Sequence, residues 1–600
     1  VCTNPPYMGS KGMDTKVLKY INKHYSECKS DLYAVFIIKC NQITKLNSYQ
    51  SMITQQSWMY LTSFKELRKK LLMKTKINEI LHLGANAFEE ISGEVVQSCA
   101  FTIKNIRVID NRIQVFDLYN YKDAKLIQQA FEEKWCKTYQ TLSQKDYLSM
   151  PSKIIGYRLN KDTIQLYKKN EVLDRYYEIK RGPSLPNNDK YIRRWFEVSF
   201  QKIQMTSTKS KWRLCTRSGS KNKWYDIILD VIDERILHQI SNYSYQNKRC
   251  IVWPDARYGS TSISAIIKEE YVAVESGMNL IYKNEKNDYN VLLALFNTYL
   301  YEELLSNMVN GQHFSPIYIK KLPFFKLDKD FINYRIDSII DNLKKLEKHH
   351  ENSINFKGIK VSGNLKQSST NFIEWNNELI SDIISTEKQI EDYLIKSTGI
   401  PKNEYHNYNN KYFIEINSEQ DYVKSVISYA VGCMFGRYSL DEEGLIYAGG
   451  DFDNKFRLRD GQWEIQTKEG WKKSSINIVE HNVIPIVDGD YFEDDIVKRF
   501  VDFVKVSFGE ETLEENLDYI AKTLGKRANE TSRQAIRRYF LKDFYKDHVR
   551  TYKKRPIYWL FDSGRQDGFK ALIYMHRYDP STVARVRTDY LHSLQKKYEA

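Results

Sequence analysis

Over residues 1–103, short apolar runs alternate with amphipathic segments. The apolar runs have the length of strands, and the amphipathic segments have helical spacing, as at Val17, Leu18 and Ile21. Asp31 stands where its charge favours the N-terminal end of a helix dipole. We predict strands over 1–3, 51–54, 77–83 and 98–103, two helices within 14–46 and one over 64–72. This alternation, with 98–103 as its last strand, is typical of the second half of a doubly wound α/β sheet.

The pattern changes after residue 150 and again after 325 and 400. Prolines at 151, 183 and 186 accompany irregular alternation, whereas 325–400 return to helical spacing with a polar interruption near 351–370. A chain of 600 residues exceeds one domain. We predict an α/β domain over 1–150, an α+β domain over 151–325, a helical spacer over 326–400 and a mostly helical region over 401–600. The spacing in the spacer is compatible with a coiled pair of helices but too short to establish a heptad. Further helices are expected between 491 and 550.

Charge and cysteine usage narrow the function classes. The chain carries 91 Lys and Arg against 76 Asp and Glu, a formal net charge of +15, which favours nucleic acid as partner before a membrane. No apolar run approaches the ~20 residues of a membrane span. The eight cysteines form no Cys-x-x-Cys pair, so we expect reduced thiols in the cytoplasm and no zinc site. Because the sequence opens inside an apolar run without Met, we expect a fragment of a longer protein.

The first candidate site is the tetrapeptide Asn4-Pro5-Pro6-Tyr7, directly after the apolar run Val1-Cys2-Thr3. Two prolines cannot continue a helix or an inner strand, and Asn4 before a proline is pushed toward extended geometry. The result is a stiff corner, here called the elbow. The Asn4 amide oxygen and the Pro5 carbonyl can accept hydrogen bonds from the N6 amino group of an adenine, and Tyr7 offers a face for stacking. The plain alternative is a Pro-Pro turn without function.

The elbow resembles the catalytic motif of amino-group DNA methyltransferases. The longer run from Val1 to Met13 is similar to one group of them, the PglX methyltransferases of BREX phage-defence systems, which are related to fused type IIG restriction-modification enzymes. The blocks 51–59 and 81–88 resemble later blocks of that family. The resemblance implies a site-specific adenine-N6 methyltransferase that uses S-adenosylmethionine, with Asn4, Pro5, Pro6 and Tyr7 as catalytic residues and no metal. Phe88 is then a candidate second stacking face, although Trp58 and Phe88 equally suit a core.

The cofactor half of such an enzyme is missing from this sequence. Methyltransferases of this kind carry a Gly-rich strand–turn–helix upstream of the elbow, and nothing in 1–600 supplies it. We interpret the glycines in 431–436 and 448–450 as turn or packing glycines. The fold class implied is therefore the second half of a doubly wound methyltransferase sheet, with S-adenosylmethionine held mainly by residues upstream.

Basic and aromatic residues are interleaved over 190–225, where the resemblance places the start of a target-recognition domain. Cationic groups neutralise phosphates and aromatic rings cover sugars and bases. The DNA-binding candidates are Lys190, Arg193, Arg194, Lys211, Arg213, Lys223, Trp212 and Trp224, in a stretch that also holds Trp195, Lys209, Arg217 and Lys221. Each tryptophan equally suits a core. The resemblance also suggests a closing strand for this domain over 314–323.

The sequence also bears on functions other than methylation. A fused nuclease needs clustered carboxylates and a lysine; Pro254-Asp255 lacks a following Asp/Glu-x-Lys, and Glu132-Glu133-Lys134 precedes it on a helical stretch, so cleavage is not favoured. A second hypothesis is a non-catalytic fragment that recognises DNA or docks phage-defence partners, and a third is the methyltransferase-specificity part of a type IIG enzyme. For 401–600, DNA wrapping and contact with partner subunits both stay open. The expected partners are double-stranded DNA and other defence subunits, with no membrane.

Overall fold

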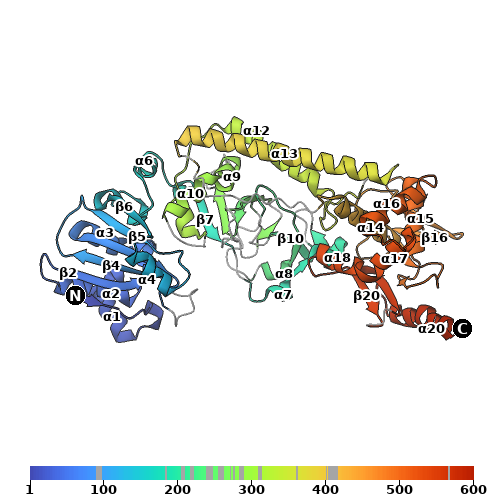
Figure 1. The fold of residues 1–600 in the computed structure, drawn as a ribbon, viewed down its shortest axis with the longest axis horizontal. Coiled ribbons are helices and arrows are strands. Elements are labelled where there is room, and N and C mark those ends of the chain that lie inside the picture. Colours follow the sequence, from blue (N-terminus) through green and yellow to red (C-terminus); the bar gives the residue numbers. More distant parts are fainter. Residues whose placement is uncertain are drawn as a thin grey trace.

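Four regions follow one another along the molecule in the computed structural model (Figure 1). An N-terminal α/β domain lies at one end, and two further sheets follow it. A long helix pair lies along one side, and a C-terminal region occupies the other end. The structure describes residues 1–600 except 89–96, 183–184, 205–209, 217–221, 238, 240–247, 255–262, 270–271, 275–277, 283–288, 309–313, 360–362, 401, 403–415, 565–567 and 600.

The N-terminal domain is built on a six-stranded sheet of order β1-β2-β4-β3-β5-β6. Its strands are β1 (Cys2–Thr3), β2 (Tyr49–Gln55), β3 (Lys76–Gly84), β4 (Ser98–Lys104), β5 (Arg112–Asp117) and β6 (Lys137–Ser143). Its helices are α1 (Thr15–His24), α2 (Leu32–Ile43), α3 (Lys65–Lys74), α4 (Ala124–Glu132), α5 (Gln144–Tyr147) and α6 (Lys161–Lys169). The predicted strands and helices of 1–103 are confirmed. The prediction that 98–103 is the last strand is wrong, because β4 pairs antiparallel between β2 and β3, and β5 and β6 extend the sheet beyond β3.

The helices of this domain follow from their side chains. In α2, six residues of twelve are buried, which explains its nearly continuous apolar sequence. Asp31 is its N-cap, and the carboxylate accepts a hydrogen bond from the Tyr33 amide, as the predicted helix start requires. In α1, by contrast, only Ile21 is buried.

The middle region holds one mixed sheet and one antiparallel sheet. One has the order β14-β10-β11-β8 with β9 beside β10, and the other has the order β13-β12-β15-β7. The strands are β7 (Tyr177–Arg181), β8 (Ile192–Arg194), β9 (Ile203–Gln204), β10 (Trp212–Thr216), β11 (Asp230–Asp233), β12 (Cys250–Trp253), β13 (Ile266–Lys268), β14 (Ala273–Val274) and β15 (Met278–Tyr282). The helices are α7 (Asn188–Tyr191), α8 (Glu234–Leu237), α9 (Tyr289–Asn297), α10 (Tyr299–Met308) and α11 (Pro316–Ile319).

One expectation for this region fails at its C-terminal end. The segment 314–323, expected as a closing strand, contains the short helix α11 instead. Pro316 occupies the first turn of that helix, where a missing N–H costs nothing, and Ser315 precedes it in extended geometry. The helix start therefore outweighs the apolar alternation of the segment.

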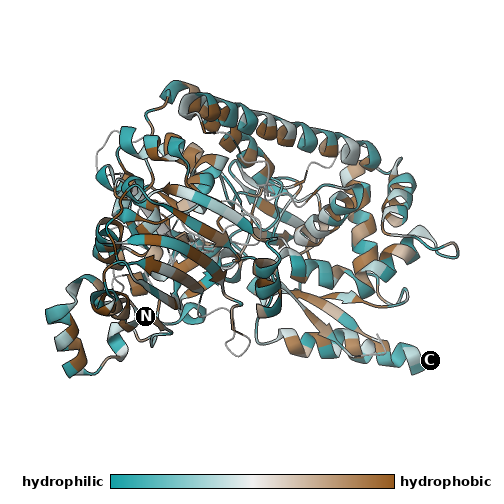
Figure 2. Ribbon diagram, turned by 60° about the vertical axis from the view of Figure 1, so that its left-hand side comes forward, coloured by the Kyte–Doolittle hydropathy of each residue, from teal (hydrophilic) through white to brown (hydrophobic). Residues whose placement is uncertain are grey.

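The predicted spacer is an antiparallel pair of helices, α12 (Lys329–Glu347) and α13 (Leu365–Thr398). The start of α12 meets the end of α13, where the rings of Phe331 and Tyr393 stack with centroids 4.4 Å apart and the Asp328 amide donates to the Tyr393 hydroxyl at 2.8 Å. With 34 residues, α13 spans ~51 Å and runs along one side of the middle region toward the C-terminal region (Figure 1). Hydrophilic and hydrophobic residues alternate along both helices (Figure 2), as expected for helices packed on one side only.

The C-terminal region confirms the helices expected between 491 and 550 but adds two three-stranded sheets, β16-β17-β18 and β19-β21-β20. Its helices are α14 (Glu419–Met434), α15 (Ile496–Phe508), α16 (Leu513–Thr523), α17 (Ser532–Lys542), α18 (Phe544–Thr551), α19 (Thr582–Arg585) and α20 (His592–Glu599). Its strands are β16 (Phe456–Arg459), β17 (Gln462–Thr467), β18 (Gly470–Lys473), β19 (Ile484–Ile486), β20 (Tyr558–Asp562) and β21 (Lys570–Tyr574).

Two large cores run through the molecule and divide the middle region between them. The first joins the N-terminal domain to Trp224, Trp253 and the facing sides of α12 and α13. The second joins Trp195 and Trp212 to the C-terminal region. The middle region is therefore fixed to its neighbours on both sides by buried apolar side chains rather than by surface contacts. Among the described residues, no helix has the length and apolar content needed to cross a membrane.

Candidate functional site

The strands of the N-terminal sheet bring several loops to one edge. β1 runs parallel to β2, β3 runs in the same direction with β4 reversed between them, and β5 is parallel to β3. The C-terminal ends of β1, β2, β3 and β5 therefore meet at one edge, and the elbow, Gln56, Ala85 and Leu118 follow these ends. Open α/β sheets place their ligands at this edge.

The elbow occupies the outer end of that edge. Asn4 is exposed directly after β1, Pro5 is buried, and Pro6 is exposed. Tyr7 is half-buried, and its hydroxyl donates to the carbonyl of Ile53 in β2 at 3.3 Å. Pro5 and Tyr7 thus anchor the corner to the sheet while the Asn4 amide stays open to a ligand.

The ring of Tyr7 is supported from behind. Tyr33 meets it edge-on with ring centroids 5.9 Å apart, and the Tyr33 hydroxyl is 2.7 Å from the Ser57 hydroxyl. Burial, with a smaller contribution from the Cys99 thiol, raises the pKa of Tyr7 to about 12. The phenol is therefore neutral at physiological pH, keeps its donor proton, and presents an uncharged ring.

Asp31 ties the segment after the elbow to helix α2. Its carboxylate accepts hydrogen bonds from the amides of Met8 at 3.1 Å and Tyr33 at 3.3 Å. The Leu32 amide donates to the Met8 carbonyl at 3.0 Å, which closes the same junction. Burial raises the pKa of Asp31, so desolvation outweighs the hydrogen bonds that this carboxylate accepts.

A buried polar chain lies under the middle of the edge. His82 of β3 is fully buried, its Nε2 contacts the Gln56 side-chain oxygen, and its Nδ1 lies 2.8 Å from the Tyr157 hydroxyl. The Gln56 amide donates in turn to Gln97. Burial lowers the pKa of His82 to about 3, so the ring is neutral; because the Gln56 oxygen accepts, Nε2 carries the proton and Nδ1 accepts from Tyr157. Sequence reasoning did not predict these buried hydrogen bonds.

Two aromatic candidates near the edge differ in position. Trp58 is fully buried and meets Phe101 edge-on at 5.2 Å, which confirms that it packs the core. Phe88 is half-buried, four residues beyond Gly84. Gly84 has φ +72°, and a Cβ there would lie 2.8 Å from the Tyr119 carbonyl oxygen, so this turn requires glycine.

The structure divides the predicted DNA-binding residues. Lys190 and Lys211 are exposed, and each ammonium lies over a neighbouring ring, Tyr191 at 5.3 Å and Trp212 at 5.6 Å. Arg193 and Arg194 are half-buried; Arg193 donates to the Ile192 carbonyl at 2.7 Å, and Arg194 pairs with Asp230 at 2.9 Å. These four keep surface area at which a phosphate could be bound.

The other four predicted DNA-binding residues are buried, and their prediction is wrong. Trp212, Arg213, Lys223 and Trp224 are 9%, 5%, 4% and 1% exposed. The Trp224 indole donates to Glu387 of α13 at 2.5 Å, the Lys223 ammonium lies 3.6 Å from the same carboxylate, and Arg213 lies 3.7 Å from Glu234. These side chains join sheet to helix and leave no surface for DNA. Three further cations of the basic stretch lie outside the described residues: Lys209, Arg217 and Lys221. Asp255, the acidic residue compared with a nuclease motif, also lies outside them.

The glycines considered for cofactor binding are occupied by packing, as expected. A Cβ on Gly432 in α14 would lie 2.3 Å from the Tyr438 ring, and Gly449 and Gly450, with φ of +87° and +99°, pass within contact of Ser199 and Gln201. None of the three therefore forms a cradle for a cofactor. Among the described residues, no group of three His, Cys, Asp or Glu side chains could hold a metal ion.

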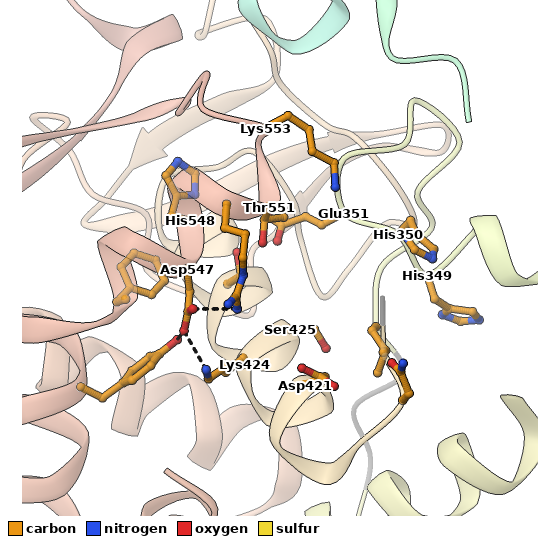
Figure 3. Close-up of a pocket in the computed structure, with 16 residues that line it drawn as sticks. His349, His350, Glu351, Asp421, Lys424, Ser425, Asp547, His548, Thr551 and Lys553 are labelled. Carbon is orange, nitrogen blue, oxygen red and sulfur yellow. Dashed lines mark hydrogen bonds and ion pairs between the residues drawn. The ribbon is translucent and has the colours of Figure 1, made fainter. Parts of the chain in front are cut away.

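A separate cavity of about 470 Å³ lies between α14, α18 and the loop at 349–351 (Figure 3). Its cations are largely neutralised from within, because Asp547 receives Lys424 at 3.0 Å, Arg550 at 2.8 Å and the Tyr539 hydroxyl at 3.0 Å. The basic helix α17 is similar: Arg533 pairs with Glu514, Arg538 with Glu530, and Arg537 with Asp490 and Asp495. The predicted basic character of this helix is thus balanced by neighbouring carboxylates.

Comparison with known proteins shows which proteins this chain is similar to. Residues 1–88, which contain the elbow, Asp31 and His82, match the family model of the Eco57I restriction-modification methylase. The whole chain is 33% identical to the adenine-specific methyltransferase PglX of Lacticaseibacillus casei (strain Zhang). It is 29% identical, again along its whole length, to the adenine-specific methyltransferase BrxX of Escherichia coli O9:H4 (strain HS).

The chain is a relative of the PglX-type methyltransferases along its whole length. This confirms the resemblance found in the sequence. The chain spans about half the length of the curated relatives it matches, 51% of each. Among solved structures, the DNA complex of the type IIL restriction-modification enzyme MmeI matches with a TM-score of 0.42 at 10% identity, over 68% of this chain and 55% of that one.

Proposed function

We propose that this chain is the base-handling and DNA-recognising part of a site-specific DNA adenine-N6 methyltransferase in bacterial phage defence. The observation that carries the proposal is the elbow: an open Asn4 amide and a supported Tyr7 ring at the ligand-binding edge of the sheet. It lies inside the segment that matches a methylase family model, in a chain related throughout to adenine-specific methyltransferases.

In this function each elbow residue has a distinct role. The Asn4 side-chain oxygen and the Pro5 carbonyl accept hydrogen bonds from the N6 amino group of an adenine turned out of the duplex. Pro5 and Pro6 fix the direction of both acceptors. Tyr7 stacks on the base, and Phe88, which is half-buried, is the candidate for a second stacking face.

S-adenosylmethionine would supply the methyl group. Gly432, Gly449 and Gly450 are engaged in packing, and no cofactor-binding step is assigned to the described residues. This observation also favours the second candidate for the isolated chain, a fragment that binds DNA without turnover. The two candidates predict different results when the chain alone is titrated with S-adenosylmethionine in a calorimeter: saturable binding supports a catalytic unit, and no binding supports the fragment.

The other regions are assigned by the same reasoning. We propose that 1–150 is the second half of a doubly wound methyltransferase sheet, 151–325 a target-recognition domain for double-stranded DNA, and 326–400 the spacer. Lys190, Arg193, Arg194 and Lys211 are the surface cations of the target-recognition domain retained for DNA contact. The region 401–600 is proposed to contact DNA or other defence subunits.

Tyr7 offers a direct test of the stacking role in the full-length protein. Tyr7→Phe keeps the ring and loses only the 3.3 Å bond to Ile53, whereas Tyr7→Ala removes the face itself. We expect Tyr7→Phe to methylate DNA at close to the parental rate and Tyr7→Ala to lose about 5- to 150-fold, since stacking on an aromatic side chain contributes ~1–3 kcal/mol. Equal activity of Tyr7→Ala and the parent would refute the stacking role.

A further inference from the structure

Helix α1 presents a cationic face beside the elbow that no assignment above uses. With about 100° per residue, Lys16, Lys19 and Lys23 fall within ~60° of arc on the side opposite Ile21. All three lysines are exposed, and Ile21, 2% exposed, is the buried residue of the helix. The helix therefore rests on the domain through Ile21 and points the lysine face at solvent.

The charge of this face is not balanced locally. Among the described residues, none of the three lysines forms an ion pair or a side-chain hydrogen bond, unlike the arginines of α17. The nearby acids are engaged elsewhere: Asp14 caps α1 by accepting from the Lys16 and Val17 amides, and Glu27 pairs with Lys70 at 2.5 Å. Asp31 accepts from two amides. Lys11 and Lys29, both exposed, add to the same surface.

The chain fixes this face close to the elbow. Only the turn of residues 8–14 separates Tyr7 from α1, and that turn is held by hydrogen bonds from the Met8 amide to Asp31 and from the Ser10 amide to the Ser30 carbonyl at 3.1 Å. An adenine that leaves the duplex stays attached to its own backbone, so the phosphates on either side of it must lie close to the residues that hold the base. A cationic face that follows the elbow after one short, fixed turn is therefore a candidate to bind those phosphates.

We propose that Lys16, Lys19 and Lys23 of α1 bind the phosphates that flank the extruded adenine. Tyr20 is 56% exposed beside this face, and its ring is tilted against that of His24 with centroids 4.6 Å apart. It provides an aromatic neighbour that can cover a sugar. The inference rests on the proposed function, because it assigns the strand partner of the same base-handling site.

The test is the salt dependence of DNA binding by the full-length protein. The variant K16Q/K19Q/K23Q removes the three charges and keeps the side-chain length nearly unchanged. The matched control K366Q/K388Q/K396Q removes three exposed lysines from α13, which lies on the opposite side of the molecule in Figure 1. Affinity for a duplex is measured from low to high salt, and initial rates of methylation are measured in parallel over a range of DNA concentrations, which gives KM and kcat.

Each phosphate contact contributes about 0.9 to the slope of log affinity against log salt. We expect the α1 variant to lose about 2–3 from that slope, with a raised KM for DNA and a kcat near the parental value, while the α13 control keeps the parental slope. An α1 variant whose slope and KM equal those of the control overturns the proposal. A parent that binds duplex without salt dependence, or does not methylate it, instead contradicts the proposed function itself.

Discussion

Asp31 provides a prediction in which two substitutions at one position should behave differently. Its carboxylate caps α2 and holds the Met8 amide behind the elbow, at 3.3 and 3.1 Å from the two amide nitrogens. Asp31→Ala removes the one carboxylate oxygen, Oδ1, that accepts both bonds. Loss of an N-cap costs about 1 kcal/mol, and the second bond, to a charged partly buried acceptor, brings the total to about 2 kcal/mol. Asp31→Asn keeps an acceptor of equal capping strength.

The raised pKa of Asp31 indicates how Asp31→Asn should change the stability of this junction. Because burial favours the protonated form in the folded state, the charged carboxylate is a cost above its pKa, and a neutral amide avoids that cost. We therefore expect Asp31→Asn to be neutral within about 0.5 kcal/mol. In a chain with several domains global unfolding is not two-state, so the assay is hydrogen exchange of the peptides that contain Met8 and Tyr33.

The expected result is an increase in exchange of roughly 5–30-fold for Asp31→Ala and little change for Asp31→Asn. Asp14→Ala serves as the matched control, because Asp14 caps α1 without touching the elbow; it should accelerate exchange in α1 and leave Met8 unchanged. Equal loosening by Asp31→Asn and Asp31→Ala would refute the view that the acceptor, not the charge, holds this junction.

Two further predictions concern buried groups. Gly432→Ala should destabilise the C-terminal region by roughly 1–3 kcal/mol, because the new Cβ would overlap the Tyr438 ring. The loss is measured as a lower transition temperature of this region in calorimetry. Gly568→Ala, with its nearest atom at 3.8 Å, is the control, and equal stability of the two variants would contradict the packing. His82 has its pKa lowered to about 3, so its contribution to stability is present above pH 6.5 and is lost as the pH falls below that value. Between pH 6.5 and pH 5 the loss is about 2 kcal/mol, and His82→Gln should reduce this acid sensitivity in hydrogen exchange of β3; an unchanged pH dependence would count against it.

The periodic parts of the fold were predictable from the sequence, and the long-range parts were not. Helices α1 and α2 and strands β2 and β3 follow from local spacing. The insertion of β4 between β2 and β3 depends on pairing with strands distant in sequence. The local alternation of apolar and polar residues does not show which strands pair. The prediction therefore found the elements of the sheet but not its order or its last two strands.

The same limit applies to the candidate site. The elbow is a continuous motif and could be found from the sequence, whereas His82, Gln56 and Tyr157 meet across separations of 26 and 75 residues. Their only signal was that the blocks containing His82 and Gln56 resemble a family. Interleaved lysines and tryptophans suggested a DNA surface, but the carboxylate that buries Lys223 and Trp224 belongs to α13, more than 160 residues away.

The central claim is that the exposed Asn4 amide grips the adenine amino group, and one measurement tests it most directly. The N6-methyladenine formed in duplex DNA is quantified by mass spectrometry for the full-length parent, for Asn4→Ala, and for Asn377→Ala, an exposed asparagine of α13, as control. The account predicts a loss of about 10²–10³-fold for Asn4→Ala, the range for removal of one preorganised hydrogen-bonding group, with DNA affinity unchanged and the control fully active. Methylation by Asn4→Ala at the parental rate would contradict it.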